Sequence, residues 1–117
     1  MQVASVVLSF LLALVAGFSG LGKLQKKPQI MSSMEHVGVK LNQIPVLAYL
    51  ELAGALGLLA GLAFVGLGVL SSSALSLYFV GAVIAHLKVN DGPAGFAPPL
   101  VLGLLYAVNA YLIASAF

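Results

Sequence analysis

Apolar residues fill four long stretches of this chain, and short polar connections separate them. The stretches cover about residues 2–22, 43–64, 67–87 and 98–117. Each is close to the roughly 20 residues that a helix needs to cross the hydrocarbon core of a bilayer. The pattern predicts one all-α membrane domain over residues 1–117, an antiparallel bundle of four transmembrane helices.

The first connection carries a shorter hydrophobic pattern of its own. Pro28 favours the start of a helix and Gly38 favours its end. The apolar residues in this region fall on one helical face, at Ile30, Met34, Val37 and Leu41. We therefore predict a short amphipathic helix between spans 1 and 2, lying flat at the membrane interface.

The third connection is marked by Gly92-Pro93 and by Pro98-Pro99. Glycine and proline commonly mark turns and helix starts. We place the start of the fourth span at Pro98.

Composition supports the membrane assignment and excludes several kinds of chemistry. Hydrophobic residues make up 62% of the chain and charged residues 7%, whereas a soluble domain carries roughly a quarter charged residues. The chain has no cysteine, so it cannot supply disulfides, thiolate metal sites or iron–sulfur clusters. It also has no arginine, which disfavours a bidentate phosphate clamp and a nucleic-acid partner.

The lysines predict the orientation of the bundle. All five lie in the first and third connections or at the ends of the spans beside them, at Lys23, Lys26, Lys27, Lys40 and Lys88. Cytoplasmic loops are enriched in lysine and arginine. We expect a multi-pass protein of the plasma (inner) membrane, with these connections in the cytoplasm and both termini outside.

A small set of polar side chains enters the predicted spans. Glu51 lies inside the second span, where a carboxylate is expensive unless it is paired or faces a polar interior. Lys23 ends the first span, and His86 ends the third at a similar depth, with Tyr78 deeper on the same helix. We predict that Lys23, Glu51, Tyr78 and His86 form one polar cluster. Two interpretations stay open, a buried ion pair that fixes helix register and a pocket that binds a lipid-like ligand.

Asn109 and Tyr106 form a second candidate polar pair, one turn apart in the fourth span. We expect Asn109 to make an interhelical hydrogen bond. His36 is interpreted as a solvated residue on the amphipathic helix. A haem held by His36 and His86 is disfavoured, because the two residues differ in predicted depth and nothing orients them together. The sequence shows no nucleophile–base pair, phosphate loop or metal-ligand motif, so no catalytic or metal-binding residue is assigned.

Three segments carry a family resemblance. They are Ser19–Lys23, with a Gly-x-x-Lys end, Glu51–Gly61, with the pattern Glu-Leu-x-Gly-x-x-Gly-Leu, and Gly81–Leu87, with the pattern Gly-Ala-x-x-x-His. With its span count and spacing, the chain resembles the DoxX-like family of small four-span membrane proteins. Some members of that family are named after a subunit of a thiosulfate:quinone oxidoreductase. Others are linked to bacterial oxidative-stress complexes, and an animal branch is similar to assembly chaperones for ligand-gated channels.

The resemblance implies an accessory subunit or assembly factor of a bacterial inner membrane. We expect a non-catalytic module that binds a membrane or cytoplasmic protein partner or a lipid-like molecule, with no intrinsic cofactor. Stripes of small residues in the spans would serve contacts within one chain or within a homo-oligomer.

Two other functions remain open. One is a quinone-binding subunit of a redox complex, which is the expected class if the protein is catalytic. The other is a small proton-coupled transporter. The chain is similar in size to small multidrug transporters, which use a glutamate in the first span, and its own first span has no acidic residue.

Overall fold

The computed structural model describes residues 3–115, and every regular secondary-structure element within that range is a helix. The predicted outer ends of spans 1 and 4, at Gln2 and at residues 116–117, lie outside the described residues. The helices are α1 (Val3–Leu24), α2 (Pro28–His36), the short 3-10 helix η1 (Leu41–Gln43), α3 (Ile44–Ala60), α4 (Val65–Lys88) and α5 (Pro93–Ser115). Four helical stretches are long and apolar enough to cross a membrane, as the sequence predicted: α1, η1 continued by α3 (Leu41–Ala60), α4 and α5.

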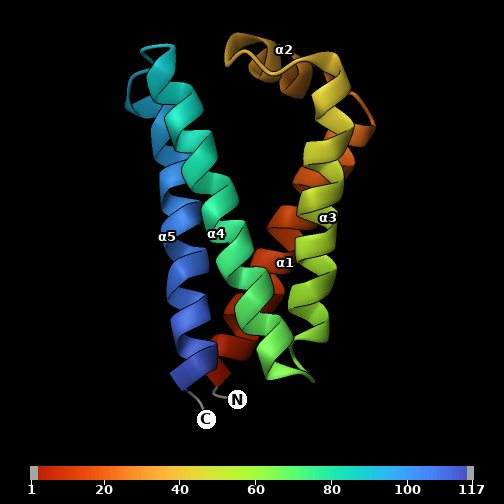
Figure 1. Ribbon diagram of the computed structural model, residues 1–117, viewed down its shortest axis with the longest axis vertical. Coiled ribbons are helices and arrows are strands. Elements are labelled where there is room, and N and C mark those ends of the chain that lie inside the picture. The colour runs from red at the N-terminus through yellow and green to blue at the C-terminus, as the bar shows by residue number, and fades with distance from the viewer. Residues whose placement is uncertain (1–2, 116–117) are drawn as a thin grey trace.

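The four long helices are arranged as two pairs (Figure 1). One pair is α1 with α3, and the other is α4 with α5, which share the most extensive interface. The pairs meet near the two chain ends and separate toward the opposite end, where α2 lies across the bundle (Figure 1). The first and third connections therefore share one end of the molecule, and the described ends of the chain share the other.

The start of the fourth span differs from the prediction. Helix α5 begins at Pro93, five residues before Pro98, and Pro98 and Pro99 lie inside it. Proline fits the first helical position because the amide there has no intrahelical partner. Pro98 and Pro99 fall in the second turn, where they remove two further amide donors without ending the helix. The sequence prediction therefore placed the start of the helix at Pro98, although it begins at the preceding proline, Pro93.

A short helix between spans 1 and 2 is present as α2, but it ends at His36, so Val37 and Leu41 lie beyond it and not on its apolar face as predicted. Its end is a Schellman arrangement, in which the Val39 amide donates to the Met34 carbonyl at 2.9 Å and the Gly38 amide donates to Glu35 at 3.1 Å. Gly38 adopts a φ of 82°, a left-handed conformation that glycine tolerates best. The helix has no buried residue, so the rest of the protein holds it only loosely.

The distribution of burial is that of a protein surrounded by lipid. Large apolar side chains face the surroundings, as at Leu77, where 72% of the residue is exposed. The interior holds Leu12, Leu58 and Tyr106 together with an unusual share of polar residues, namely Ser5, Ser9, Lys23, Glu51, Ser71, Ser72 and Asn109. Apolar surface faces outward and polar groups face one another, as expected where the solvent is hydrocarbon.

Glycines set two of the closest helix contacts. A Cβ at Gly20 of α1 would lie 3.0 Å from the Ala48 carbonyl oxygen of α3. A Cβ at Gly61, the residue that ends α3, would lie 2.7 Å from the backbone nitrogen of Gly68 in α4. Small residues let helix backbones approach closely enough for van der Waals contact to stabilise them in lipid.

Candidate functional site

An ion pair between α1 and α3 forms the centre of the candidate site. Lys23 Nζ donates to Glu51 Oε1, and the side chains are 7% and 0% exposed. The Lys23 ammonium also donates to Ser19 Oγ at 2.9 Å, one turn back along α1. The buried face of α3 that carries Glu51 also carries Ala48, Ala55 and Leu58. The lysine therefore turns back into the bundle instead of extending to the interface.

Tyr78 of α4 joins this pair from the other half of the molecule. Its hydroxyl donates to Glu51 Oε1 at 3.1 Å. The neighbouring ring of Phe79 packs edge-on to Tyr78, with centroids 5.1 Å apart, and stacks on Tyr106 of α5 at 5.5 Å. Lys23, Glu51 and Tyr78 thus connect three helices through one carboxylate oxygen, and we call these three residues the polar cluster.

The second carboxylate oxygen of Glu51 accepts no such hydrogen bonds. Glu51 Oε2 is buried and has no hydrogen-bond partner among the described residues. A buried acceptor without a partner costs about 1–3 kcal/mol, and more when the group is charged. One oxygen of the Glu51 carboxylate in the polar cluster therefore lacks a hydrogen-bond donor among the described residues.

His86 does not belong to the polar cluster, which corrects the sequence prediction. Its Nδ1 lies 2.6 Å from Asp91 Oδ2, in the connection between α4 and α5. His86 stands in the last turn of α4, so the returning chain supplies a nearer carboxylate than Glu51. Similar predicted depth was not enough to bring His86 and Glu51 together.

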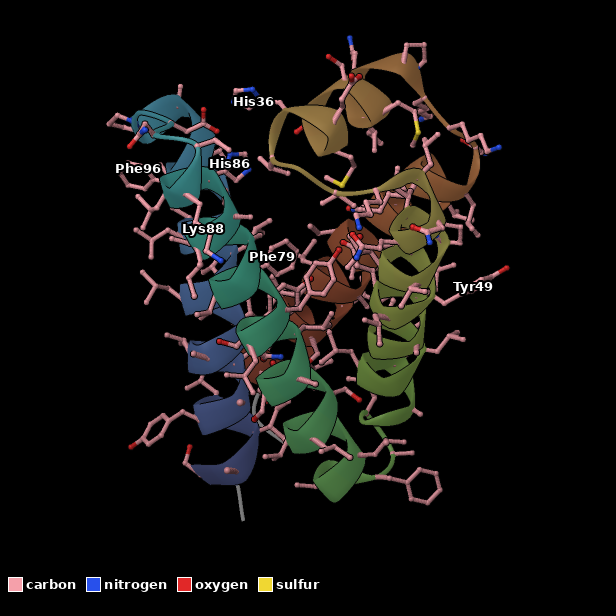
Figure 2. All side chains as sticks on the ribbon, turned by 45° about the horizontal axis from the view of Figure 1, so that its top comes forward. His36, Tyr49, Phe79, His86, Lys88 and Phe96 are labelled. Carbon is pink, nitrogen blue, oxygen red and sulfur yellow. The ribbon has the colours of Figure 1, made fainter. Side chains whose placement is uncertain are left out.

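Asp91 also contacts the amphipathic helix. His36 Nε2 lies 2.6 Å from Asp91 Oδ1. Figure 2 shows His36 at the end of α2 directed toward His86 at the upper end of α4. The sequence predicted different depths for these two histidines, whereas in the structure both contact the Asp91 carboxylate. We call His36, Asp91 and His86 the histidine bridge, because they join α2 to the α4–α5 pair.

A cavity of about 190 Å³ adjoins the polar cluster beneath the first connection. Lys23 and Lys26 line it together with the apolar residues Leu24, Met31, Leu41, Ile44 and Pro45. Lys23 is the residue of the polar cluster that borders this cavity.

Comparison with known proteins agrees with this architecture. A model of the DoxX-like family matches residues 7–109, which is most of the chain. The chain belongs to the DoxX-like family. No curated protein and no solved structure matched it. The family match and the four apolar helices together indicate that this DoxX-like protein is a multi-pass membrane protein in contact with the lipid bilayer.

The second predicted polar pair of the DoxX-like protein lies at the opposite end of the interior. Asn109 Nδ2 donates to Ser9 Oγ at 3.1 Å and to Ser72 Oγ at 3.3 Å, which joins α5 to α1 and α4. Tyr106 donates separately to the Leu12 carbonyl at 2.7 Å. Both residues are fully buried, and each makes its own interhelical bond. This network is complete within the described part of the chain, so we assign it a structural role.

Several buried or paired polar residues were missed at the sequence level. Asp91 is one of three acidic residues in the chain, and its position five residues after His86 was a signal for a short-range contact. Ser5 and Ser9 lie four residues apart and therefore share a helix face. Serines in an apolar span satisfy their hydroxyls across helices, so this spacing could have located the interior of α1.

The described residues contain no group of three or more histidine, cysteine or acidic side chains placed to hold a metal ion. The cluster offers a carboxylate, an ammonium and a phenol. These groups can bind a polar head, hold its charge and exchange a proton with it.

We expect the histidine bridge to make the attachment of α2 depend on pH. Hydrogen bonds from His36, and then from His86, hold the pKa of Asp91 below its usual range. A depressed carboxyl pKa stabilises the docked state above the ordinary value, near pH 4, and that stabilisation is lost as the pH falls through the lowered pKa. We expect α2 to stay docked at neutral pH and to separate from α4–α5 in stronger acid.

Paired spin labels can measure this docking, because the chain has no native cysteine. Labels at the exposed positions Ser33→Cys and Ala94→Cys should give one narrow distance distribution at neutral pH and a broad one in acid. Asp91→Ala should give the broad distribution at both pH values, and the neighbouring control Lys88→Gln should not. A narrow distribution in the Asp91→Ala variant would show that other contacts hold α2.

Proposed function

We propose that this DoxX-like protein is a non-catalytic membrane module that binds a lipid-like molecule through Lys23, Glu51 and Tyr78. It would act as an accessory subunit or assembly factor. The observation that carries the proposal is Glu51 Oε2, a buried acceptor without a partner among the described residues. Membrane interiors retain ionisable groups mainly where they serve a ligand or a pathway.

The chemistry of the polar cluster supports a ligand over a purely structural pair. A structural ion pair offsets its desolvation only when hydrogen bonds satisfy the remaining lone pairs. Here Lys23 and Tyr78 both donate to Oε1 of Glu51, which leaves the other oxygen for a donor from outside the chain. Lys23 also lines one cavity and Tyr78 lines another, so residues of the polar cluster border space that a ligand could occupy.

Native mass spectrometry of the gently extracted protein tests this function. The wild-type protein should retain a lipid-like adduct, and Glu51→Gln should lose most of it, because the amide replaces an acceptor oxygen and removes the charge. Ser76→Ala is the matched control, since the Ser76 hydroxyl donates to the Gly103 carbonyl and lies outside the cluster. Equal adducts in wild type and Glu51→Gln, or none in either, would refute the proposal.

A quinone-binding role in a redox complex is the second candidate. It is favoured by the Tyr78 hydroxyl and the free Glu51 oxygen, which together place a proton donor and a proton acceptor at one point inside the bundle. The chain has no cysteine to carry electrons, so a partner subunit would have to supply them. The mass of the retained adduct decides between a quinone and another lipid.

We also propose that the end of the molecule bearing α2 faces the cytoplasm of a bacterial inner membrane. All five lysines lie at that end, and positively charged loops remain on the cytoplasmic side. A membrane-impermeant thiol reagent added to intact cells should therefore fail to label Ser33→Cys. Rapid labelling would show that the end bearing α2 faces the outside of the cell.

A further inference from the structure

The cavity that Tyr78 lines lies between α3 and α4 and has a volume of about 490 Å³. Leu70 and Leu77 line it where the protein meets its surroundings, at 66% and 72% exposure, and the buried Leu75 lines it toward the interior. None of its lining residues carries a charge. The two helices meet near the chain ends and separate toward α2 (Figure 1), so the cavity opens sideways to the lipid.

Ser71 places a buried hydroxyl group on this cavity. The residue is 8% exposed, and its hydroxyl makes no hydrogen bond within the described part of the chain. Two nearby serines of α4 differ from it. Ser72 Oγ donates to the Tyr106 carbonyl of α5 at 2.7 Å. Ser76 Oγ donates to the Gly103 carbonyl of α5 at 2.8 Å. Buried hydroxyls are normally hydrogen-bonded, so the exception at Ser71 indicates a partner from outside the chain.

Helix α3 gives the Ser71 side chain space but no polar side chain to bond. The residue of α3 beside it is Gly57, where a Cβ would overlap Ser71 Oγ. The Gly57 carbonyl already accepts from the Gly61 amide at 2.8 Å. The residues of α3 that line the cavity are Leu50, Ala53 and Gly54. The hydrogen-bonding capacity of Ser71 is therefore left for a molecule that enters the cavity.

We infer that this cavity binds a neutral lipid that carries a hydroxyl group, with that hydroxyl paired to Ser71. A serine hydroxyl has one donor and two acceptor positions, so an alcohol can both accept from Ser71 and donate to it. The hydrocarbon chain lies against Leu75 and Gly54. An ionised head is disfavoured, because the cavity has no lining charge to balance it within the membrane. This site goes beyond the proposed function, since its polar contact is Ser71 and not the polar cluster.

Photoaffinity labelling of the full chain in phosphatidylcholine nanodiscs tests the inference. The probes are hexadecanol with a diazirine in its chain, the methyl ether of that alcohol, and the corresponding hexadecyl phosphate. Intact mass gives the yield of crosslinked protein, and fragmentation locates the crosslink. In wild type the alcohol should label residues 50–54 and 70–78 at a lower concentration than the other two probes. Ser71→Ala should weaken this labelling about threefold to tenfold, as expected for loss of one hydrogen bond.

Ser73→Ala is the matched control, because Ser73 lies on the same helix, is less buried and does not line the cavity. It should leave the labelling unchanged. Equal labelling by the alcohol and its ether, wild-type labelling in Ser71→Ala, or equal losses in both serine variants would overturn the inference. Loss of labelling in Glu51→Gln but not in Ser71→Ala would also overturn it and would assign the cavity to the polar cluster, in agreement with the proposed function.

Discussion

Replacing Lys23 with methionine should lower the free energy of unfolding by about 3–5 kcal/mol, the range measured when one partner of a buried ion pair is removed. The reason is geometric. Glu51 is 0% exposed, and it would keep only the hydroxyl of Tyr78 as a donor among the described residues. Thermal or denaturant unfolding in a mild detergent measures the loss.

A double variant separates the ion pair from simple packing. Lys23→Met with Glu51→Met removes both charges and should recover most of the lost stability, because apolar residues of similar volume commonly replace a buried pair without loss. If the single variant unfolds like wild type, the lysine is not the partner that Glu51 needs. If the double variant is no better than the single one, the loss arises from packing around Lys23.

Gly61→Ala should be the most damaging small substitution, with a loss of about 3 kcal/mol, the upper part of the range for an overpacked contact. The new methyl group would meet the Cα and, at 2.7 Å, the nitrogen of Gly68. Backbone atoms cannot rotate away as a side chain can, so α3 and α4 must move apart where they meet. The melting temperature in detergent should fall sharply.

Gly66→Ala is the matched control for this prediction. Gly66 lies in the first turn of α4, and a Cβ there meets no atom within 4 Å. Alanine favours helix by up to about 1 kcal/mol over glycine, so this variant should be neutral or slightly more stable. Equal losses of stability in the two variants would show that the connection between α3 and α4 requires the backbone flexibility of glycine and not the close helix contact.

The sequence was sufficient for the architecture because lipid imposes long apolar segments on any helix that spans it. The four spans, the amphipathic α2 and its end at Gly38 all followed from hydrophobic spacing and from glycine and proline. The start of α5 did not, because proline is compatible with the whole first turn of a helix and a little beyond. Three prolines at Pro93, Pro98 and Pro99 therefore left the first helical residue ambiguous.

Side-chain pairing was predictable only where topology forced it. Lys23 and Glu51 lie on neighbouring antiparallel helices near the same end, which brings them within reach. His86 had the same approximate depth, yet its rotation around α4 and the nearby Asp91 decided its partner. The contact that His36 makes with Asp91 beside His86 depends on the tilt of α2 across the separated helix pairs (Figure 1), and no hydrophobic pattern encodes that tilt.

The carboxyl group of Glu51 can be observed directly by infrared difference spectroscopy, since the chain has only three acidic residues and Glu51→Gln removes one band. We predict that this band shifts when delipidated protein in nanodiscs is supplied with lipid extracted from its own membrane, as the free oxygen gains a donor. A Glu51 band that stays unchanged when the extract is added would contradict a ligand site built on the polar cluster.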